Sequence, residues 1–177
     1  MMLTSDEILK NLKEGNIVIY PFNLENLNPN SYDIRLGNTM LEYSDTLLDP
    51  FKQNNYEKLL AYKDDSGRRY WILEANKLYL SHTLEYTETL NLIPCLSGKS
   101  SLARLGLQIH MTAGFGNIGF KGYWTLEIKA CQEIKLYAGM RIGQIYYTDP
   151  SGKIDKLYNG KYQGNNGVEA SKTWIKE

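Results

Sequence analysis

Hydrophobic positions at the start of the chain follow a helical period. Ile8 and Leu12 recur at a spacing that places them on one face of a helix. Thr4 and Glu7 form a capping-box pattern in front of this stripe, and Gly15 is a typical helix end. The sequence therefore predicts a helix between Thr4 and Gly15.

From residue 16 onward the pattern alternates, which is typical of strands with one buried face. In one of these segments Tyr32, Ile34 and Leu36 fall on one side, whereas Asp33 and Arg35 fall on the other. Turn-forming Gly, Pro and Asn residues separate the segments. Strands are expected at 16–20, 31–37, 71–73, 77–83, 88–95, 123–129 and 142–147.

Many short strands with few helices indicate an all-β fold, a barrel or a sandwich, with one or two short helices. The length of 177 residues suits one domain, and neither a repeat nor a linker divides the chain. We therefore expect a single domain over residues 1–177. Residues 158–167 are too polar for a core, so we expect this tail to be disordered or to be ordered by a ligand.

The composition narrows the function. Lys plus Arg number 20 and Asp plus Glu number 20, so the chain lacks the positive excess of a nucleic-acid binder, although a local cluster could bind a small polyanion. The two cysteines do not form a disulfide framework. The sequence shows neither a signal peptide nor an apolar run long enough for a membrane span, and we expect a cytoplasmic protein with no membrane partner.

Several familiar motifs fail on inspection. Gly98-Lys99-Ser100 resembles the end of a phosphate-binding loop, but Ile93 stands where that loop needs a glycine. The histidines are isolated, and no second cysteine follows Cys95 at the spacing of a zinc deaminase, so no metal-ligating residues and no zinc are expected. A Cys–His nucleophile pair stays open, but two buried, inert cysteines are the favoured interpretation.

Residues 98–106 combine groups that suit an anion. Ser100 or Ser101 can cap a short helical turn, Gly106 can end it, and Arg104 then shares a face with Ser100. Together with Lys99 these groups would form a compact anion receptor. The alternative is an ordinary capped turn with solvated cations.

A glycine-studded segment, residues 112–122, precedes the strand that carries Glu127. Glycine allows the backbone to approach a ligand closely, so this loop could bind a flat base edge; a hairpin with bulges is the alternative. Alternation places Glu127 on one face with Tyr123 and Thr125. Glu127 is either a solvated sheet residue or, within a pocket, a candidate general base.

Taken together, these segments resemble the dCTP deaminase branch of the dUTPase superfamily. The resemblance covers most of the chain and is weakest between about residues 46 and 70. It includes 98–107 (GKSSLARLGL), 110–115 (HMTAGF), 119–122 (GFKG), 125–127 (TLE), 30–37 (NSYDIRLG), 82–85 (HTLE), 139–144 (GMRIGQ) and 161–163 (KYQ).

The resemblance implies a distorted β barrel or jelly roll that assembles as a homotrimer with active sites between subunits. It also implies hydrolytic deamination of dCTP without a metal at the ring, inhibition by dTTP, and Mg²⁺ bound through the nucleotide phosphates. Residues 158–177 would form a lid over the site.

The same resemblance implies roles for individual residues. Glu127 would be the general base and acid, and the Ala113 carbonyl, Ser100 and Arg104 would hold the attacking water. The other substrate contacts would come from the serine turn (Lys99, Ser101), the glycine loop (Gly114, Phe115, Asn117, Gly119) and the tail (Tyr158, Lys161, Gln163, Asn165).

Three positions depart from the family pattern. Lys99 replaces an arginine, which keeps the charge but loses the bidentate fork. Asn117 stands where dUTPases carry an aspartate, which weakens the case for a dUTP diphosphatase. Gly114-Phe115 resembles members that convert dCTP to dUMP and pyrophosphate, so dUTP and dUMP both remain open as products. A non-catalytic trimeric nucleotide sensor is the remaining alternative.

Overall fold

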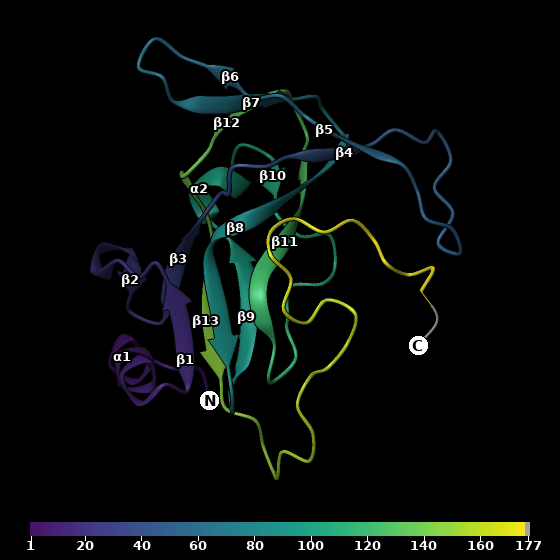
Figure 1. Ribbon diagram of the computed structural model, residues 1–177. Coiled ribbons are helices and arrows are strands. Elements are labelled where there is room, and N and C mark those ends of the chain that lie inside the picture. Colours follow the sequence, from purple (N-terminus) through teal and green to yellow (C-terminus); the bar gives the residue numbers. More distant parts are fainter. Residues whose placement is uncertain (176–177) are drawn as a thin grey trace.

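The computed structural model describes residues 1–175 and shows a mostly β chain with short helices (Figure 1). The helices are α1 (Ser5–Glu14), the 3-10 turn η1 (Leu24–Asn26) and α2 (Ser100–Ala103). The strands are β1 (Ile17–Tyr20), β2 (Leu27–Asn28), β3 (Ser31–Arg35), β4 (Leu41–Tyr43), β5 (Tyr56–Lys58), β6 (Tyr62–Lys63), β7 (Arg69–Leu73), β8 (Leu78–Thr89), β9 (Ile93–Gly98), β10 (Leu107–Gln108), β11 (Lys121–Ala130), β12 (Ile134–Tyr137) and β13 (Arg141–Thr148).

Within residues 1–175 the strands form three sheets. The largest has the order β10-β11-β8-β4-β5 with β1 also paired to β8, the second is β2-β3-β13-β9, and the third is β12-β7-β6. In Figure 1 the third sheet lies at the top and α1 packs beside β1 at the lower left. The expected all-β fold is confirmed, as a distorted arrangement in which the sheets do not close into a barrel.

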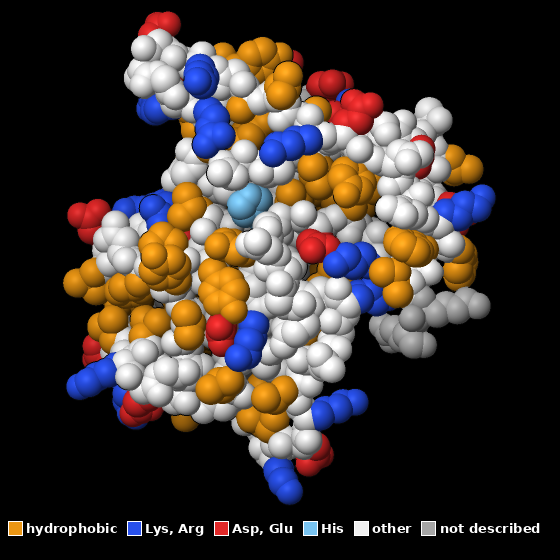
Figure 2. All heavy atoms as spheres, viewed as in Figure 1, with side chains coloured by type: hydrophobic (Ala, Val, Ile, Leu, Met, Phe, Trp, Pro, Cys, Tyr) orange, Lys and Arg blue, Asp and Glu red, His pale blue; other side chains and the backbone are white. Residues whose placement is uncertain are grey.

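The core lies between the inner faces of the first two sheets. Leu126 and Ile128 on β11, Ile34 on β3 and Leu36 directly after β3 are fully buried, as the alternation predicted. Asp33, on the opposite face of β3, is buried as well at 2% exposure, so that face is not solvated. On the face of the molecule in Figure 2, Lys and Arg side chains lie interspersed with Asp and Glu.

The predicted strands at 77–83 and 88–95 were wrong in their boundaries. One strand of 12 residues, β8, runs on from the first segment to Thr89 in the second, and β9 begins only at Ile93. The buried face of β8 carries Ser81, Thr83, Glu85 and Thr87 rather than apolar residues. These side chains are satisfied by hydrogen bonds to other segments, which sequence alternation does not reveal.

The helix ends follow the prediction only in part. Gly15 ends α1 in the left-handed region with φ 77°, as expected. Thr4 is the N-cap, but its side chain makes no capping bond, and Glu7 pairs with Lys10 instead. The N-cap of α2 is Lys99 rather than either serine. No helix within residues 1–175 is both long and apolar enough to cross a membrane.

Candidate active site

A cavity of about 420 Å³ lies against the outer face of β11, where Glu127 is exposed to it. Alternation along β11 buries Trp124 and Leu126 in the core and turns Thr125 and Glu127 outward, as predicted. The lining comes from β11 and its neighbours, the glycine loop and the tail: Tyr43, Leu78, Leu80, Ala113, Gly116, Asn117, Phe120, Tyr123, Trp124, Thr125, Glu127, Tyr158, Tyr162, Asn165, Glu169 and Ser171.

The Glu127 carboxylate is half-buried and is held by the main chain. Its Oε2 accepts a hydrogen bond of 2.9 Å from the Met111 N–H, at the start of the glycine loop. A backbone donor has little freedom to move, so this bond fixes the carboxylate at the cavity wall. A carboxylate in this position can take a proton from a bound water and return it.

The glycine loop lies beside this carboxylate. Ala113 and Asn117 line the same cavity as Glu127, which brings together three of the residues singled out in the sequence. Phe115 is 67% exposed and lines a second cavity of about 870 Å³, together with Asn117, Tyr158 and Lys161. Gly114 has no room for a side chain, because a Cβ there would lie 2.9 Å from the His110 ring.

Two glycines of this loop lie against the tail. Gly119 (φ 88°) and Gly122 (φ 144°) both adopt positive φ angles. A Cβ at Gly119 would lie 2.6 Å from the Leu157 Cβ, and one at Gly122 would overlap the Asn165 side chain. In this chain these glycines therefore allow the protein's own tail to approach β11 closely.

The tail makes specific contacts with the rest of the chain, whereas its ordering by a ligand stays a prediction. Gln163 accepts from the Lys121 N–H at 2.9 Å and donates to the Gly119 carbonyl at 2.7 Å. Asn165 is 8% exposed and forms a parallel bridge with Gly122. Its Oδ1 is buried against Gly122 and has no hydrogen-bond partner among the described residues.

Farther along the tail, backbone N–H groups close the cavity. Glu169 donates to the Thr125 hydroxyl at 3.0 Å, and Ser171 donates to the Tyr43 hydroxyl at 2.9 Å. The amine of Lys161 is bonded within the tail, to the carbonyls of Lys172 and Ile175.

The serine turn lies apart from this cavity in a single chain. Ser100, Ser101 and Arg104 are exposed, and none of them lines the Glu127 cavity. Arg104 instead lines a separate cavity of about 430 Å³ with Gly106 and Cys131. The expected constellation thus occurs as two groups, one around Glu127 and the other on α2.

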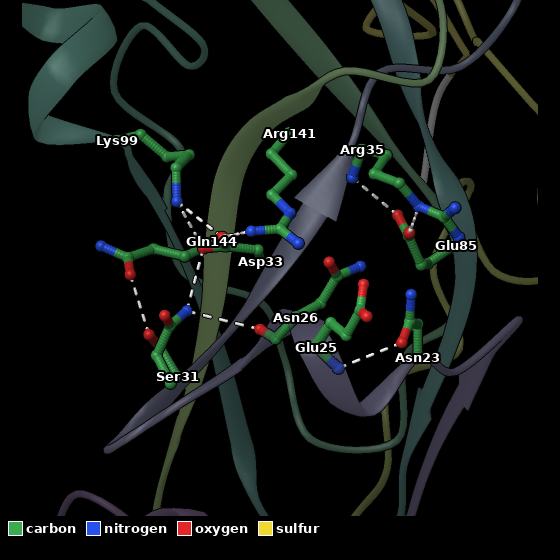
Figure 3. A network of polar contacts seen from close by, with 11 residues as sticks. Asn23, Glu25, Asn26, Ser31, Asp33, Arg35, Glu85, Lys99, Arg141 and Gln144 are labelled. Carbon is green, nitrogen blue, oxygen red and sulfur yellow. Dashed lines mark hydrogen bonds and ion pairs between the residues drawn. The ribbon is translucent and has the colours of Figure 1, made fainter.

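A polar network anchors the start of α2 (Figure 3). The Lys99 Nζ lies 2.7 Å from both carboxylate oxygens of the buried Asp33. Ser31 donates to the Gln144 Oε1 at 2.8 Å in the same network. Sequence reasoning quoted these segments as motifs but gave Asp33 and Gln144 no place in the site.

Several cavity residues were also missed. Thr125 and Tyr123 alternate with Glu127, and this spacing could have identified them. Tyr162 lies within the tail motif that was already recognised. Tyr43 carried no such signal, because only the folded chain brings β4 next to the tail.

Among the described residues, the favoured interpretation of two buried, inert cysteines holds for Cys95 and is wrong for Cys131. Cys95 is buried and Cys131 exposed, and both are unpaired thiols. Burial raises the pKa of the Cys95 thiol, which disfavours the thiolate. Among residues 1–175, no group of three or more His, Cys, Asp or Glu side chains is placed to hold a metal.

Comparison with known proteins identifies the family. The profile described as dCTP deaminase-like matches residues 2–149. The "dCTP deaminase, dUMP-forming" of Clostridium acetobutylicum is 47% identical over 170 residues, which is 96% of this chain and 95% of that protein. The protein of the same name from Leptospira biflexa is 45% identical over 97% of this chain and 95% of that protein.

A solved structure supports the fold independently. It is the 2'-deoxycytidine 5'-triphosphate deaminase of Agrobacterium tumefaciens, with a TM-score of 0.63 at 19% identity. The similarity covers 84% of this chain and 48% of that longer one. The matched profile and the near full-length identity show that the chain belongs to the dCTP deaminase-like family.

Proposed function

We propose that the protein deaminates dCTP and releases dUMP, ammonia and pyrophosphate. The observation that carries this proposal is the Glu127 carboxylate, held by the Met111 N–H at the wall of a cavity shared with Ala113 and Asn117. The relatives are named dUMP-forming, which supports dUMP as the product. Gly114-Phe115 in the loop, which resembles members that convert dCTP to dUMP, supports the same product.

In the proposed reaction Glu127 takes a proton from a water molecule, and the resulting hydroxide attacks carbon 4 of cytosine. The carboxylic acid gives this proton to the ring nitrogen N3. Glu127 then takes the proton of the new C4 hydroxyl and passes it to the amino group, so that the C4 carbonyl forms as the C–N bond breaks and ammonia leaves. The Ala113 carbonyl, Ser100 and Arg104 hold the water. A second water cleaves the bond between the α and β phosphates, which gives dUMP and pyrophosphate.

Each active site would form between subunits of a homotrimer. The separation of the two groups in one chain supports this assembly: Ser100, Ser101 and Arg104 are exposed on α2, away from the Glu127 cavity. A neighbouring copy would bring its own α2 to that cavity and complete the site. Lys99, Ser100 and Ser101 would then face the triphosphate.

The remaining contacts would come from the glycine loop and the tail. Residues 114–119, including Phe115 and Asn117, would meet the base and sugar. Tyr158, Lys161, Gln163 and Asn165 would close over the nucleotide, and the presence of Tyr158 and Asn165 in the lining of the Glu127 cavity supports this placement. A closed tail would exclude water and strengthen the charge contacts.

Three further expectations complete the proposal. Mg²⁺ would arrive with dCTP, held by phosphate oxygens, which are the hard ligands this ion prefers. dTTP would compete for the same site. The protein would act in the cytoplasm, without a nucleic-acid partner.

One incubation tests the reaction. The protein is mixed with dCTP or dUTP and Mg²⁺, and ammonia, dUTP, dUMP and pyrophosphate are resolved. We expect dCTP to give ammonia, dUMP and pyrophosphate, and Glu127→Gln to lower turnover by at least about a hundredfold while dCTP still binds. Glu57→Gln, which alters an exposed glutamate of β5, is the control. Near-normal turnover by Glu127→Gln would refute the assigned role.

A further inference from the structure

A buried carboxylate lies behind the start of α2. The Asp33 side chain is 3% exposed, and both of its oxygens lie 2.7 Å from the Lys99 Nζ. Asn28 donates a third hydrogen bond to the same carboxylate at 2.9 Å. Asp33 is therefore a fully engaged acceptor whose principal partner is a single lysine.

This ion pair spans a strand. Asp33 on β3 and Ser97 on β9 both lie opposite Gln144 of β13, so the strand of Gln144 separates them. Lys99 reaches back over β13 to Asp33 and is itself the N-cap of α2, directly before Ser100. The contact therefore fixes the point where the second sheet ends and the serine turn begins.

Apart from Leu102, which packs against the hydrophobic core, little else holds α2 in place. None of its residues is buried, and its N-cap makes no side-chain capping bond. A four-residue helix with a single half-buried apolar side chain gains only a little from packing, because helix stability in proteins comes mostly from tertiary contacts. The Lys99–Asp33 pair is thus the main polar anchor at the start of this turn.

The same carboxylate also faces a second cation. A guanidinium nitrogen of Arg141 lies 3.8 Å from Asp33 Oδ2, and the Arg141 side chain is 46% exposed. One negative charge between two positive charges leaves a positive excess beside Ser100. Such an excess suits an anionic substrate group.

We propose that Asp33 is a positioning residue for the triphosphate end of the substrate, and that it acts through Lys99. The Asp33 carboxylate accepts two of the three hydrogens of the Lys99 ammonium. This contact fixes the positions of Ser100 and Ser101. This inference rests on the proposed function, because it assigns the anion at α2 to the phosphates of dCTP.

A double-mutant cycle tests the proposal. Steady-state kinetics and calorimetric binding with dCTP are measured for wild type, Asp33→Asn, Lys99→Met and the double variant. We expect Asp33→Asn to raise KM and Kd by about 10- to 100-fold, the range found for outer partners that orient the ligands of metal sites. In the Lys99→Met background the same change should have almost no further effect, whereas Lys99→Arg should keep the dependence on Asp33.

The chain offers a matched control. Glu85 and Arg35 form an equally buried pair, with side chains 0% and 25% exposed against 3% and 26% for Asp33 and Lys99. Glu85→Gln should lower Tm in a similar way. Any change that Glu85→Gln makes in KM should be the same in the wild-type and the Lys99→Met backgrounds, because the two positions act independently. If Asp33→Asn does not fold, Asn28→Ala takes its place, because it removes the hydrogen bond that Asn28 donates to the Asp33 carboxylate. Its effect on KM should be smaller than that of Asp33→Asn and should disappear in the Lys99→Met background.

The outcomes separate the two proposals. The role of Asp33 is overturned if the effects of Asp33→Asn and Lys99→Met on KM multiply in the double variant. It is also overturned if Asp33→Asn lowers Tm but leaves KM and Kd unchanged. Both outcomes leave the deaminase proposal intact. A wild-type protein that binds dCTP without turnover refutes the deaminase proposal. The double-mutant cycle then still tests Asp33 through the measured Kd values. A wild-type protein that neither binds nor converts dCTP refutes both proposals.

Discussion

Replacing Gly122 by alanine should release the tail from β11. Gly122 has φ 144° and forms the parallel bridge to Asn165. An alanine Cβ would overlap Asn165 Oδ1 and lie 3.2 Å from the Asn165 backbone nitrogen. The flexible end of a side chain can move, but a backbone atom within a bridge cannot move without the tail.

The size of the effect follows from these contacts. Alanine at this φ costs about 1–3 kcal/mol in backbone strain, which relaxation of β11 and the tail would relieve. The tail is held here by hydrogen bonds such as Gly164 N–H to Lys121 O at 2.8 Å and Lys121 N–H to Gln163 at 2.9 Å. Each contributes about 1 kcal/mol net. A shift of about 2 kcal/mol toward the open tail raises its population roughly thirtyfold.

Hydrogen exchange measures this population directly. We expect the Gly164 amide to lose protection in Gly122→Ala, whereas the Leu126 amide in the middle of β11 keeps it. Gly152→Ala is the control, because Gly152 also has a positive φ (93°) but nothing lies within 4 Å of a Cβ there. Unchanged protection of Gly164, or an equal loss in Gly152→Ala, would refute the claim that Gly122 admits the tail.

Two other substitutions test charge and pH. Arg104→Ala should lower kcat/KM for dCTP more than Lys99→Arg, because the arginine keeps a cation that can bind Asp33 bidentately; equal losses in steady-state assays would contradict this. The pKa of His82 is lowered from 6.5, because burial disfavours its charged form more than its bond to the Thr83 carbonyl favours it. As pH falls below 6.5, the unfolded chain therefore binds the proton before the folded chain does, and the stability of the fold decreases. His82→Gln should flatten the plot of Tm against pH below 6.5. A variant profile that runs parallel to the wild-type profile would exclude His82 as the cause.

How far the sequence predicts the fold depends on what buries each strand. The faces of β3 and β11 were predictable because apolar side chains such as Ile34 and Leu126 alternate there. The course of β8 was not, because its buried face carries hydroxyls and a carboxylate whose partners are distant in sequence. Strands β5 and β6 were missed in a polar stretch, since exposed strands at a sheet edge lack the apolar signal.

The candidate site shows the same division. The sequence supplied the chemical types at Ser100, Arg104 and Glu127, and local spacing placed Glu127 correctly on its strand. It could not show that Glu127 and α2 lie apart within one chain, which depends on how the sheets pack. Nor could it pair Asp33 with Lys99, which lie 66 positions apart and meet only because β13 inserts between their strands.

Control of this site would then depend on residues that need not touch the substrate. Backbone hydrogen bonds from Glu169 and Ser171 close the tail over the Glu127 cavity. Substrate entry must break these bonds, and Gly122 determines how closely the tail can return. Since Asp33 fixes Lys99 at the other group, we expect substitutions at Gly122 to alter access to Glu127 and those at Asp33 to alter affinity for phosphate.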